Sequence, residues 1–397
     1  MKGKNLVILT VAAVILAGAA LMTSRDKRPS APDLMGRHVF PDLPVNEADR
    51  IVIYRADKSL TVAKTDDVWI SKDRYNYAAN FDRIRTLLVK LADLKIGHTV
   101  RVEESQKPEL RMISPKAAVA NNVNKTGILL EIYGNNESLL CSLLIGKPFE
   151  RKENGEEGLY GIYPDGQYIS PDNGKNVYLV SEMFNALPAE PADWLDTSLF
   201  NVDSANIKEM MITGPDRKEL RLVRNKNNRL ELPGLTEKEE IESTKINGIE
   251  TALSWLKFDD VADPALTDKE LGMDKPVIFE AVTKFGETYT VKVGGSTEDK
   301  TRHYVKISAL LKEPEAPEAA ENKAEENLTP ENSPKQGEAS GKADKRKELE
   351  LNIKTLNEKL GKWTYLISSY KTDSMTIERS ALVKAKEEKI EKKEIKK

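Results

Sequence analysis

The chain has 397 residues, of which 39% are hydrophobic and 31% are charged, so it has enough apolar side chains for two ordinary domain cores. Its formal net charge of -3 excludes the large basic field with which many proteins bind nucleic acid. Cys141 is the only cysteine, which excludes an intramolecular disulfide, a Cys-x-x-Cys redox pair and a thiolate zinc cluster.

The first 28 residues are expected to form a transmembrane anchor. An apolar run of 17 residues, from Leu6 to Met22, is just long enough to span a bilayer. Cleavage by signal peptidase after Ala17-Gly18-Ala19 is the alternative. The basic residues on the two sides of the run balance, so charge does not fix the orientation. We expect the bulk of the chain outside the cytoplasm because N-terminal anchors usually export the domains attached to them.

A proline-punctuated tether is predicted at residues 29–47, and the folded part should begin near Ala48. Three short β-rich runs come next, at residues 51–54, 60–63 and 68–70, with polar turn residues between them. This pattern predicts an antiparallel meander.

Apolar residues at helical spacing come directly after the meander. The stripe consists of Phe81, Ile84, Leu87, Leu88, Leu91 and Leu94. Asn80 is placed to cap the helix. A stripe of this kind predicts an amphipathic helix that covers one face of the meander.

The order of these segments occurs twice. Residues 109–115 and 270–276 share Glu-Leu-x-Met-x-x-Pro, and similar strands come after both motifs. In the second half, the helix stripe consists of Ile246, Ile249, Leu253 and Leu256. A period of about 160 residues suits a duplicated domain rather than a solenoid repeat. The prediction is an α+β fold with two tandem copies of a mainly antiparallel sheet unit, at residues 48–187 and 202–380, joined by a linker at residues 188–201.

One insertion interrupts the second copy. Residues 313–341 are rich in Glu, Ala, Pro, Asn and Lys and have too few apolar groups to offset the entropy of ordering, so we expect disorder there. Leu349, Ile353, Leu356 and Leu360 then predict a helix. Residues 381–397 form a lysine-rich charged tail that is expected to be solvated.

The sequence assigns no catalytic, cofactor-binding or metal-binding residue. His38, His98 and His303 lie in different segments without partners at metal-ligand spacing. Ser254 and Lys257 satisfy Ser-x-x-Lys, and residues 125–127 read Lys-Thr-Gly, as in serine acyl-transferases of the β-lactamase type. The order of the two motifs is reversed, and no Ser-Asp-Asn lies between them. A noncatalytic protein is therefore favoured, although the sequence does not decide whether the protein is an enzyme.

Several aromatic residues admit two interpretations. Tyr160, Tyr163 and Tyr168, with Trp69, could line a glycan-binding or partner-binding surface, or they could be sheet packing. Cys141 lies in an alternating apolar run and is expected to be a buried core residue.

These features together resemble the bacterial domain of unknown function 4340 (DUF4340) family. The resemblance is carried by the membrane segment, the tether, the Trp69-containing third strand, the leucine-rich helix and the Glu-Leu-x-Met-x-x-Pro motif. Members of that family look like membrane-anchored envelope proteins, often encoded beside ABC-transporter genes of the gliding-motility type. The family has no known catalytic residues, so the resemblance implies none here. The second copy differs from the first in its third strand, where Leu230 or Leu232 stands in the place of Trp69.

Two functions remain as expectations. The first is a noncatalytic, single-pass protein of the bacterial inner membrane, with periplasmic domains that act as an accessory or scaffold for an ABC-type transport complex. Its partners would be the membrane and transporter subunits, without nucleic acid or a cofactor. The alternative is an envelope carbohydrate-binding protein or hydrolase with a site built from loops.

Overall fold

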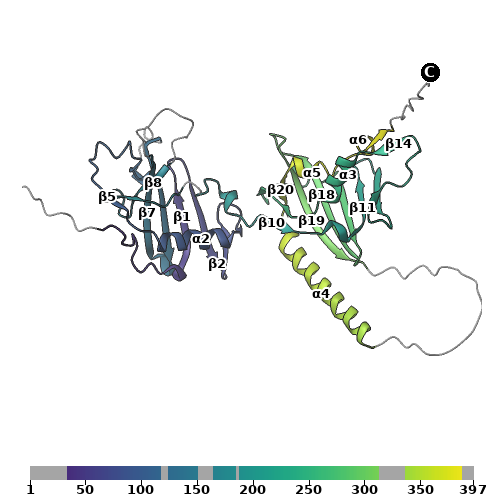
Figure 1. Ribbon diagram of the computed structural model, residues 1–397, viewed down its shortest axis with the longest axis horizontal. Coiled ribbons are helices and arrows are strands. Elements are labelled where there is room, and N and C mark those ends of the chain that lie inside the picture. Colours follow the sequence, from purple (N-terminus) through teal and green to yellow (C-terminus); the bar gives the residue numbers. More distant parts are fainter. Residues whose placement is uncertain (1–33, 118–123, 151–163, 185–186, 313–335, 387–397) are drawn as a thin grey trace, which may run out of the picture. The chain divides into compact units, whose positions relative to one another are not determined.

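A computed structural model describes residues 34–117, 124–150, 164–184, 187–312 and 336–386 (Figure 1). The chain divides into two compact units. The first unit comprises the described residues up to Thr61 together with Asp82–Leu187. The second unit comprises Val62–Phe81 together with the described residues from Pro188 onward.

The first sheet has nine strands in the order β4-β3-β2-β1-β6-β7-β8-β9-β5. These are β1 (Ala48–Tyr54), β2 (Ser59–Thr65), β3 (Val68–Ser71), β4 (Tyr77–Ala78), β5 (His98–Val100), β6 (Ile128–Gly134), β7 (Leu139–Glu150), β8 (Pro164–Ser170) and β9 (Val177–Val180). The pairs β1–β6, β6–β7, β7–β8 and β8–β9 are antiparallel, as the sequence predicted.

Helix α2 (Phe81–Ala92) lies across one face of this sheet (Figure 1). Its buried residues, Ile84, Leu87, Leu88 and Leu91, belong to the predicted stripe, as does Leu94 just beyond its end. Phe81, at the first position of the helix, is not part of this buried stripe, since 59% of its surface is exposed. Burying each of these large aliphatic side chains contributes about 1.5–3 kcal/mol to folding.

The other face of the first sheet carries a second, smaller core. Successive strand residues point to opposite faces, so Leu129 lies opposite Leu130 in β6. Leu129 packs with Met112, Leu144 and Val177. Met112 comes from the first Glu-Leu-x-Met-x-x-Pro motif, so this motif covers the second face of the sheet.

Residues before Ala48 are already attached to the first unit. Gly36 N donates to Ile96 O at 2.8 Å, and Val39 N donates to Leu94 O at 2.8 Å. Val39 is also buried. The end of the expected tether is therefore pinned to the chain that comes after α2, because its backbone groups find partners there.

The second sheet has eight strands in the order β13-β12-β11-β17-β18-β19-β20-β16. These are β11 (Ile207–Thr213), β12 (Glu219–Arg224), β13 (Leu230–Glu231), β16 (Asp260–Val261), β17 (Val277–Thr283), β18 (Glu287–Ser296), β19 (Arg302–Leu311) and β20 (Tyr365–Ser368). Two small ribbons accompany it, β10 (Ser198–Phe200) with β15 (Leu256–Lys257), and β14 (Glu239–Ile241) with β21 (Val383–Ala385).

Helix α3 (Ser243–Glu250) is shorter than the predicted stripe. Ile249, Leu253 and Leu256 are buried as expected, but the last two lie beyond the end of the helix, and Leu256 belongs to β15. The chain leaves the helical conformation at Thr251 and turns through Trp255, whose φ is 50°. The apolar spacing therefore identified core residues but not the end of the helix.

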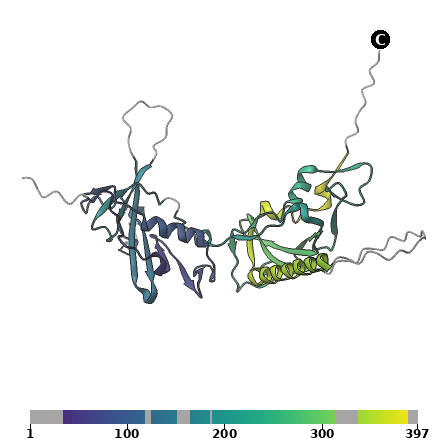
Figure 2. The same cartoon turned by 60° about the horizontal axis from the view of Figure 1, so that its bottom comes forward.

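Helix α4 (Gln336–Leu360) runs beside β19 (Figures 1 and 2). It contains the predicted stripe, of which Ile353 and Leu360 are buried. The helix begins before residue 341, where the insertion was expected to end. Residues 313–335 of the insertion and 387–397 of the tail lie outside the described residues.

The two sheets have the same connectivity when β1, β2 and β3 are matched with β11, β12 and β13, and β6 to β9 with β17 to β20. The first pairing of each sheet shifts register once, between Ala48 and Arg50 and between Ile207 and Glu209. β7 and β18 also have matching shifts, after Ile145 and after Val293. Register shifts mark β-bulges, which bend and twist a strand.

The repeated motif has the same local structure in both units. Leu110 O accepts a hydrogen bond from Lys147 N at 3.0 Å, and Leu271 O accepts one from Gly295 N at 2.8 Å. The next residues, Arg111 and Gly272, have left-handed φ values of 55° and 66°. The motif thus closes on the central strand of its own sheet in each case.

In the part of the chain that the structure describes, no helix is both long and apolar enough to cross a membrane. The expected anchor at residues 1–28 lies outside the described residues.

Candidate functional site

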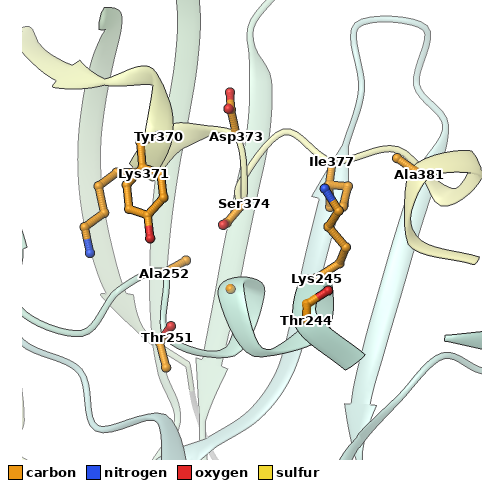
Figure 3. Close-up of a pocket in the computed structure, with 11 residues that line it drawn as sticks. Thr244, Lys245, Thr251, Ala252, Tyr370, Lys371, Asp373, Ser374, Ile377 and Ala381 are labelled. Carbon is orange, nitrogen blue, oxygen red and sulfur yellow. The ribbon is translucent and has the colours of Figure 1, made fainter. Parts of the chain in front are cut away.

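A hollow of about 290 Å³ opens in the second unit beside α3 (Figure 3). One wall is α3 itself, and the other is the chain from α5 (Ser369–Thr372) to α6 (Arg379–Leu382). This volume lies just below the roughly 300–1,000 Å³ found for ligand pockets.

Gly248 lets the two walls approach each other. A Cβ atom at this position would lie 2.8 Å from Ser374 Oγ, closer than real Cβ contacts. The absence of a side chain on this turn of α3 therefore leaves room for the Ser374 hydroxyl of the opposite wall.

Polar side chains stand along the hollow in a row. Figure 3 shows Lys371 and Lys245 at opposite ends, with Tyr370 and Ser374 between them. Tyr370 is 80% exposed, so its ring is open to solvent. Thr251 contributes a further hydroxyl, which donates to Asn247 O at 2.9 Å and keeps its lone pairs available.

The charges of the lining suit binding better than hydrolysis. Its ionisable side chains are Lys245, Lys371, Tyr370 and one carboxylate, Asp373. Glycoside hydrolysis usually needs two carboxyl groups that flank the bond. A single carboxylate between two ammonium groups can instead orient a ligand by charge and hydrogen bonds.

A second polar cluster lies on the first sheet around Glu131, whose side chain is buried. Lys116 Nζ donates to both carboxylate oxygens at 2.7 Å, and Tyr133 Oη donates at 2.5 Å. The Lys116 ammonium also lies 4.2 Å from the centre of the Tyr54 ring, and Arg50 lies 4.3 Å from that of Tyr133. The buried charge is thus fully paired and hydrogen-bonded, as a buried carboxylate must be.

The pKa values in this cluster follow from that pairing. Burial raises the pKa of Tyr133, and the hydrogen bond to Glu131 raises it further. Burial lowers the pKa of Lys116, but the hydrogen bond and charge of Glu131 outweigh this and leave it raised. Both groups are therefore held in their protonated forms, which suits a structural ion pair rather than a proton shuttle.

The histidines occupy separate places. His38 Nδ1 lies 2.9 Å from Ala92 O, and His303 Nδ1 lies 2.8 Å from the hydroxyl of buried Thr372. His98 is exposed on β5. No group of three potential metal ligands occurs among the described residues.

In the Ser-x-x-Lys motif, the Ser254 hydroxyl is hydrogen-bonded to the backbone. Ser254 Oγ donates to Val202 O at 3.1 Å, and Leu256 between them is buried. Lys125, Thr126 and Gly127 lie in the other unit. The Ser254 hydroxyl is thus used to hold the turn after α3.

Cys141 and the aromatic residues of the first sheet pack as core. Cys141 is buried, and burial raises the pKa of its thiol to about 12. Trp69 is buried, and the Tyr168 ring meets Phe149 edge-on at 6.0 Å between centroids. Tyr160 and Tyr163 lie outside the described residues.

Sequence patterns did not single out the residues of the hollow. Lys245 and Gly248 share one face of α3 at helical spacing, and Thr251 comes directly after the end of the helix, which is the one available signal. Tyr370 and Lys371 come from a segment more than a hundred residues away, and only the fold brings them to the same place.

Comparisons with known proteins identify a family. A family model described as a domain of unknown function (DUF4340) matches residues 69–276, which is 208 of the 397 residues. No curated protein and no solved structure matches the chain. Since the match covers more than half of the chain, this protein belongs to the DUF4340 family.

Proposed function

We propose that this protein is a noncatalytic accessory or scaffold protein, anchored in the bacterial inner membrane, whose extracytoplasmic units work with an ABC-type transport complex. The alternation of residues in the second sheet carries the proposal. One face of each strand belongs to the core, and the opposite face, which we name the outer face, is half-exposed.

The outer face combines apolar and charged side chains. Met211, Ile278, Val282 and Tyr304 are partly exposed there, and Leu310 is 45% exposed. Glu209 and Arg221 form an ion pair on the same face. Interaction surfaces combine partly exposed apolar side chains with charged ones, so this face supports a partner-binding role.

The two units are proposed to be copies of one ancestral unit. The shared strand order, the matching bulges and the identical closure of the Leu110 and Leu271 motifs support this. A duplicated unit offers a partner two related surfaces on one chain, which suits a scaffold.

Membrane attachment is proposed from the apolar run at residues 6–22. Protease added to spheroplasts should digest both units and leave a membrane-bound N-terminal fragment. Protection of the units would place them in the cytoplasm. A mature N-terminus at Ala20 or Leu21 would show that the run is a cleaved signal peptide.

Partner binding is tested by purifying the detergent-extracted full chain and identifying the proteins that accompany it by mass spectrometry. Membrane-spanning and ATP-binding transporter subunits should be enriched. Leu310→Arg should reduce their amount, whereas Leu351→Arg, at an exposed position of α4, should not. Recovery of the protein without transporter subunits would contradict the proposal.

A further inference from the structure

The hollow beside α3 has the chemistry of a small-ligand site that a scaffold role does not require. Lys245 on α3 and Lys371 on α5 are 126 positions apart in the sequence but line the same space. Within the described residues, neither ammonium group forms an ion pair with a side chain of the protein. Two cations are thus gathered in a protein whose formal net charge is -3.

The hydroxyl groups between the lysines define the second part of the chemistry. Tyr370, Ser374 and Thr251 present three hydroxyl oxygens toward the hollow (Figure 3). Hydroxyl groups both donate and accept hydrogen bonds, so they match a ligand that also carries hydroxyl groups. Asp373 also lines the hollow, but in Figure 3 its carboxylate points away from these hydroxyl groups.

The Tyr370 ring supplies the third part. A tyrosine side chain that is 80% exposed leaves an apolar ring face uncovered in water. Such a ring can pack against the C–H face of a sugar while its hydroxyl remains hydrated. The volume of about 290 Å³ restricts the ligand to something smaller than a typical drug molecule.

We propose that this hollow binds an acidic sugar unit, a uronate or a sugar phosphate, either free or within an envelope glycan. The ligand's anionic group lies near Lys245 or Lys371, its hydroxyl groups bond to Ser374 and Thr251, and its ring lies against Tyr370. This role is independent of the outer face of the second sheet.

The test is calorimetric titration of the detergent-solubilised full chain with glucuronate, glucose 6-phosphate, glucose and inorganic phosphate. Binding of an acidic sugar should be at least about tenfold tighter than binding of glucose or of phosphate alone, since each supplies only half of the recognition. Equal affinity for phosphate and sugar phosphate would show a general anion site and overturn the proposal. Failure of both acidic sugars to bind would overturn it as well.

Variants locate the binding. At least one of Lys245→Ala and Lys371→Ala should weaken binding about fivefold at low salt, as expected for loss of an exposed charge pair. Lys257→Ala, an exposed lysine on β15 that does not line the hollow, is the matched control. Circular dichroism checks that each variant is folded. Unchanged affinity in both folded variants, Lys245→Ala and Lys371→Ala, would show that the ligand does not bind in this hollow.

Polygalacturonate separates the two sources of the ligand. If polygalacturonate competes with glucuronate, the site takes a glycan. If glucuronate binds and polygalacturonate does not, the site takes a free acidic sugar. Loss of transporter subunits in Leu310→Arg with unchanged sugar binding would show that the two surfaces act separately.

Discussion

At the scale of single residues, Gly146 and Gly294 set how closely the repeated motif approaches its sheet. Each lies on the central strand that the motif closes on. A Cβ atom at Gly146 would lie 2.5 Å from Leu110 O, and one at Gly294 would lie 2.4 Å from Leu271 O. The absence of a side chain at both positions therefore lets the motif cover the sheet.

Gly294→Ala should destabilise the second unit by about 1–3 kcal/mol, because an added methyl group overpacks a closed contact. Urea unfolding followed by circular dichroism measures the change. Gly295→Ala is the matched control, since a Cβ there would meet its nearest atom at 3.5 Å, an ordinary contact. Equal stability of the two variants would show that the contact at Gly294 relaxes freely.

At the scale of elements, α4 protects part of β19 that β20 does not reach. The pairing of β19 with β20 ends at Val305. Farther along β19, Ala309 N donates to Asn357 Oδ1 at 2.9 Å, and Asn357 Nδ2 donates to Ala309 O at 2.7 Å. The side-chain amide of Asn357 thus takes the place of a neighbouring strand, and an exposed strand edge is avoided.

Asn357→Ala should cost about 1–3 kcal/mol because it leaves both backbone groups of Ala309 without partners. Hydrogen exchange at the Ala309 amide should accelerate. Asn352→Ala makes the same change at an exposed position of α4 and should leave the rate unchanged. A slow Ala309 amide in Asn357→Ala would mean that another group protects the edge.

The β14–β21 ribbon is held by an exposed, two-pronged ion pair. Arg379 donates to the two oxygens of Glu239 at 3.0 and 2.9 Å. The hydrogen bond from Arg379 is the main cause that lowers the pKa of Glu239 from 4.5 to about 2. The pair therefore supports the ribbon above pH 4.5, and this support is lost as the pH falls toward 2.

Glu239→Gln should speed hydrogen exchange in β21 at pH 7, and its difference from the wild type should shrink as the pH falls from 4.5 to about 2. The wild-type carboxylate gains a proton in that range and then resembles the neutral amide. Glu237→Gln changes an exposed neighbour and serves as the control. A difference that is independent of pH would argue against the ion pair.

At the scale of the whole molecule, the segment Val62–Phe81 contributes to the core of the second unit. Tyr77 lies edge-on to Trp363 at 4.9 Å and to Phe258 at 5.2 Å between ring centroids. The sequence pattern assigned this segment to residues 48–187, because it continues the first meander. A piece cut out at residue 188 would lack Tyr77 and leave aromatic core surface in water.

Tyr77→Ala should destabilise the second unit by about 3–5 kcal/mol, the range for large buried aromatic side chains. Because a chain of two units need not unfold in one step, hydrogen exchange in β20 is the suitable measurement. Tyr370→Ala makes the same change at a side chain that is 80% exposed and should have little effect. Slow exchange of β20 in Tyr77→Ala would mean that Val62–Phe81 is dispensable for this core.

Local sequence patterns were sufficient for the elements that depend on neighbouring residues. The α2 stripe, the alternating strands, the buried Cys141 and the sheet-rich α+β class all follow from periodicity and composition, which are local properties. The recurring Leu and Met positions were also visible, because both occurrences of the motif keep the same spacing to the next proline.

The meeting of distant segments depended on the tertiary structure. In the tertiary structure, Val39 is hydrogen-bonded to the chain after α2, and Tyr77 belongs to the core of the second unit. Tyr370 and Lys371 lie beside α3. Helix α3 also ends before its apolar spacing ends. Such contacts arise from the free energy of burying surface and pairing backbone groups across the whole chain, so no pattern within a short window contains them.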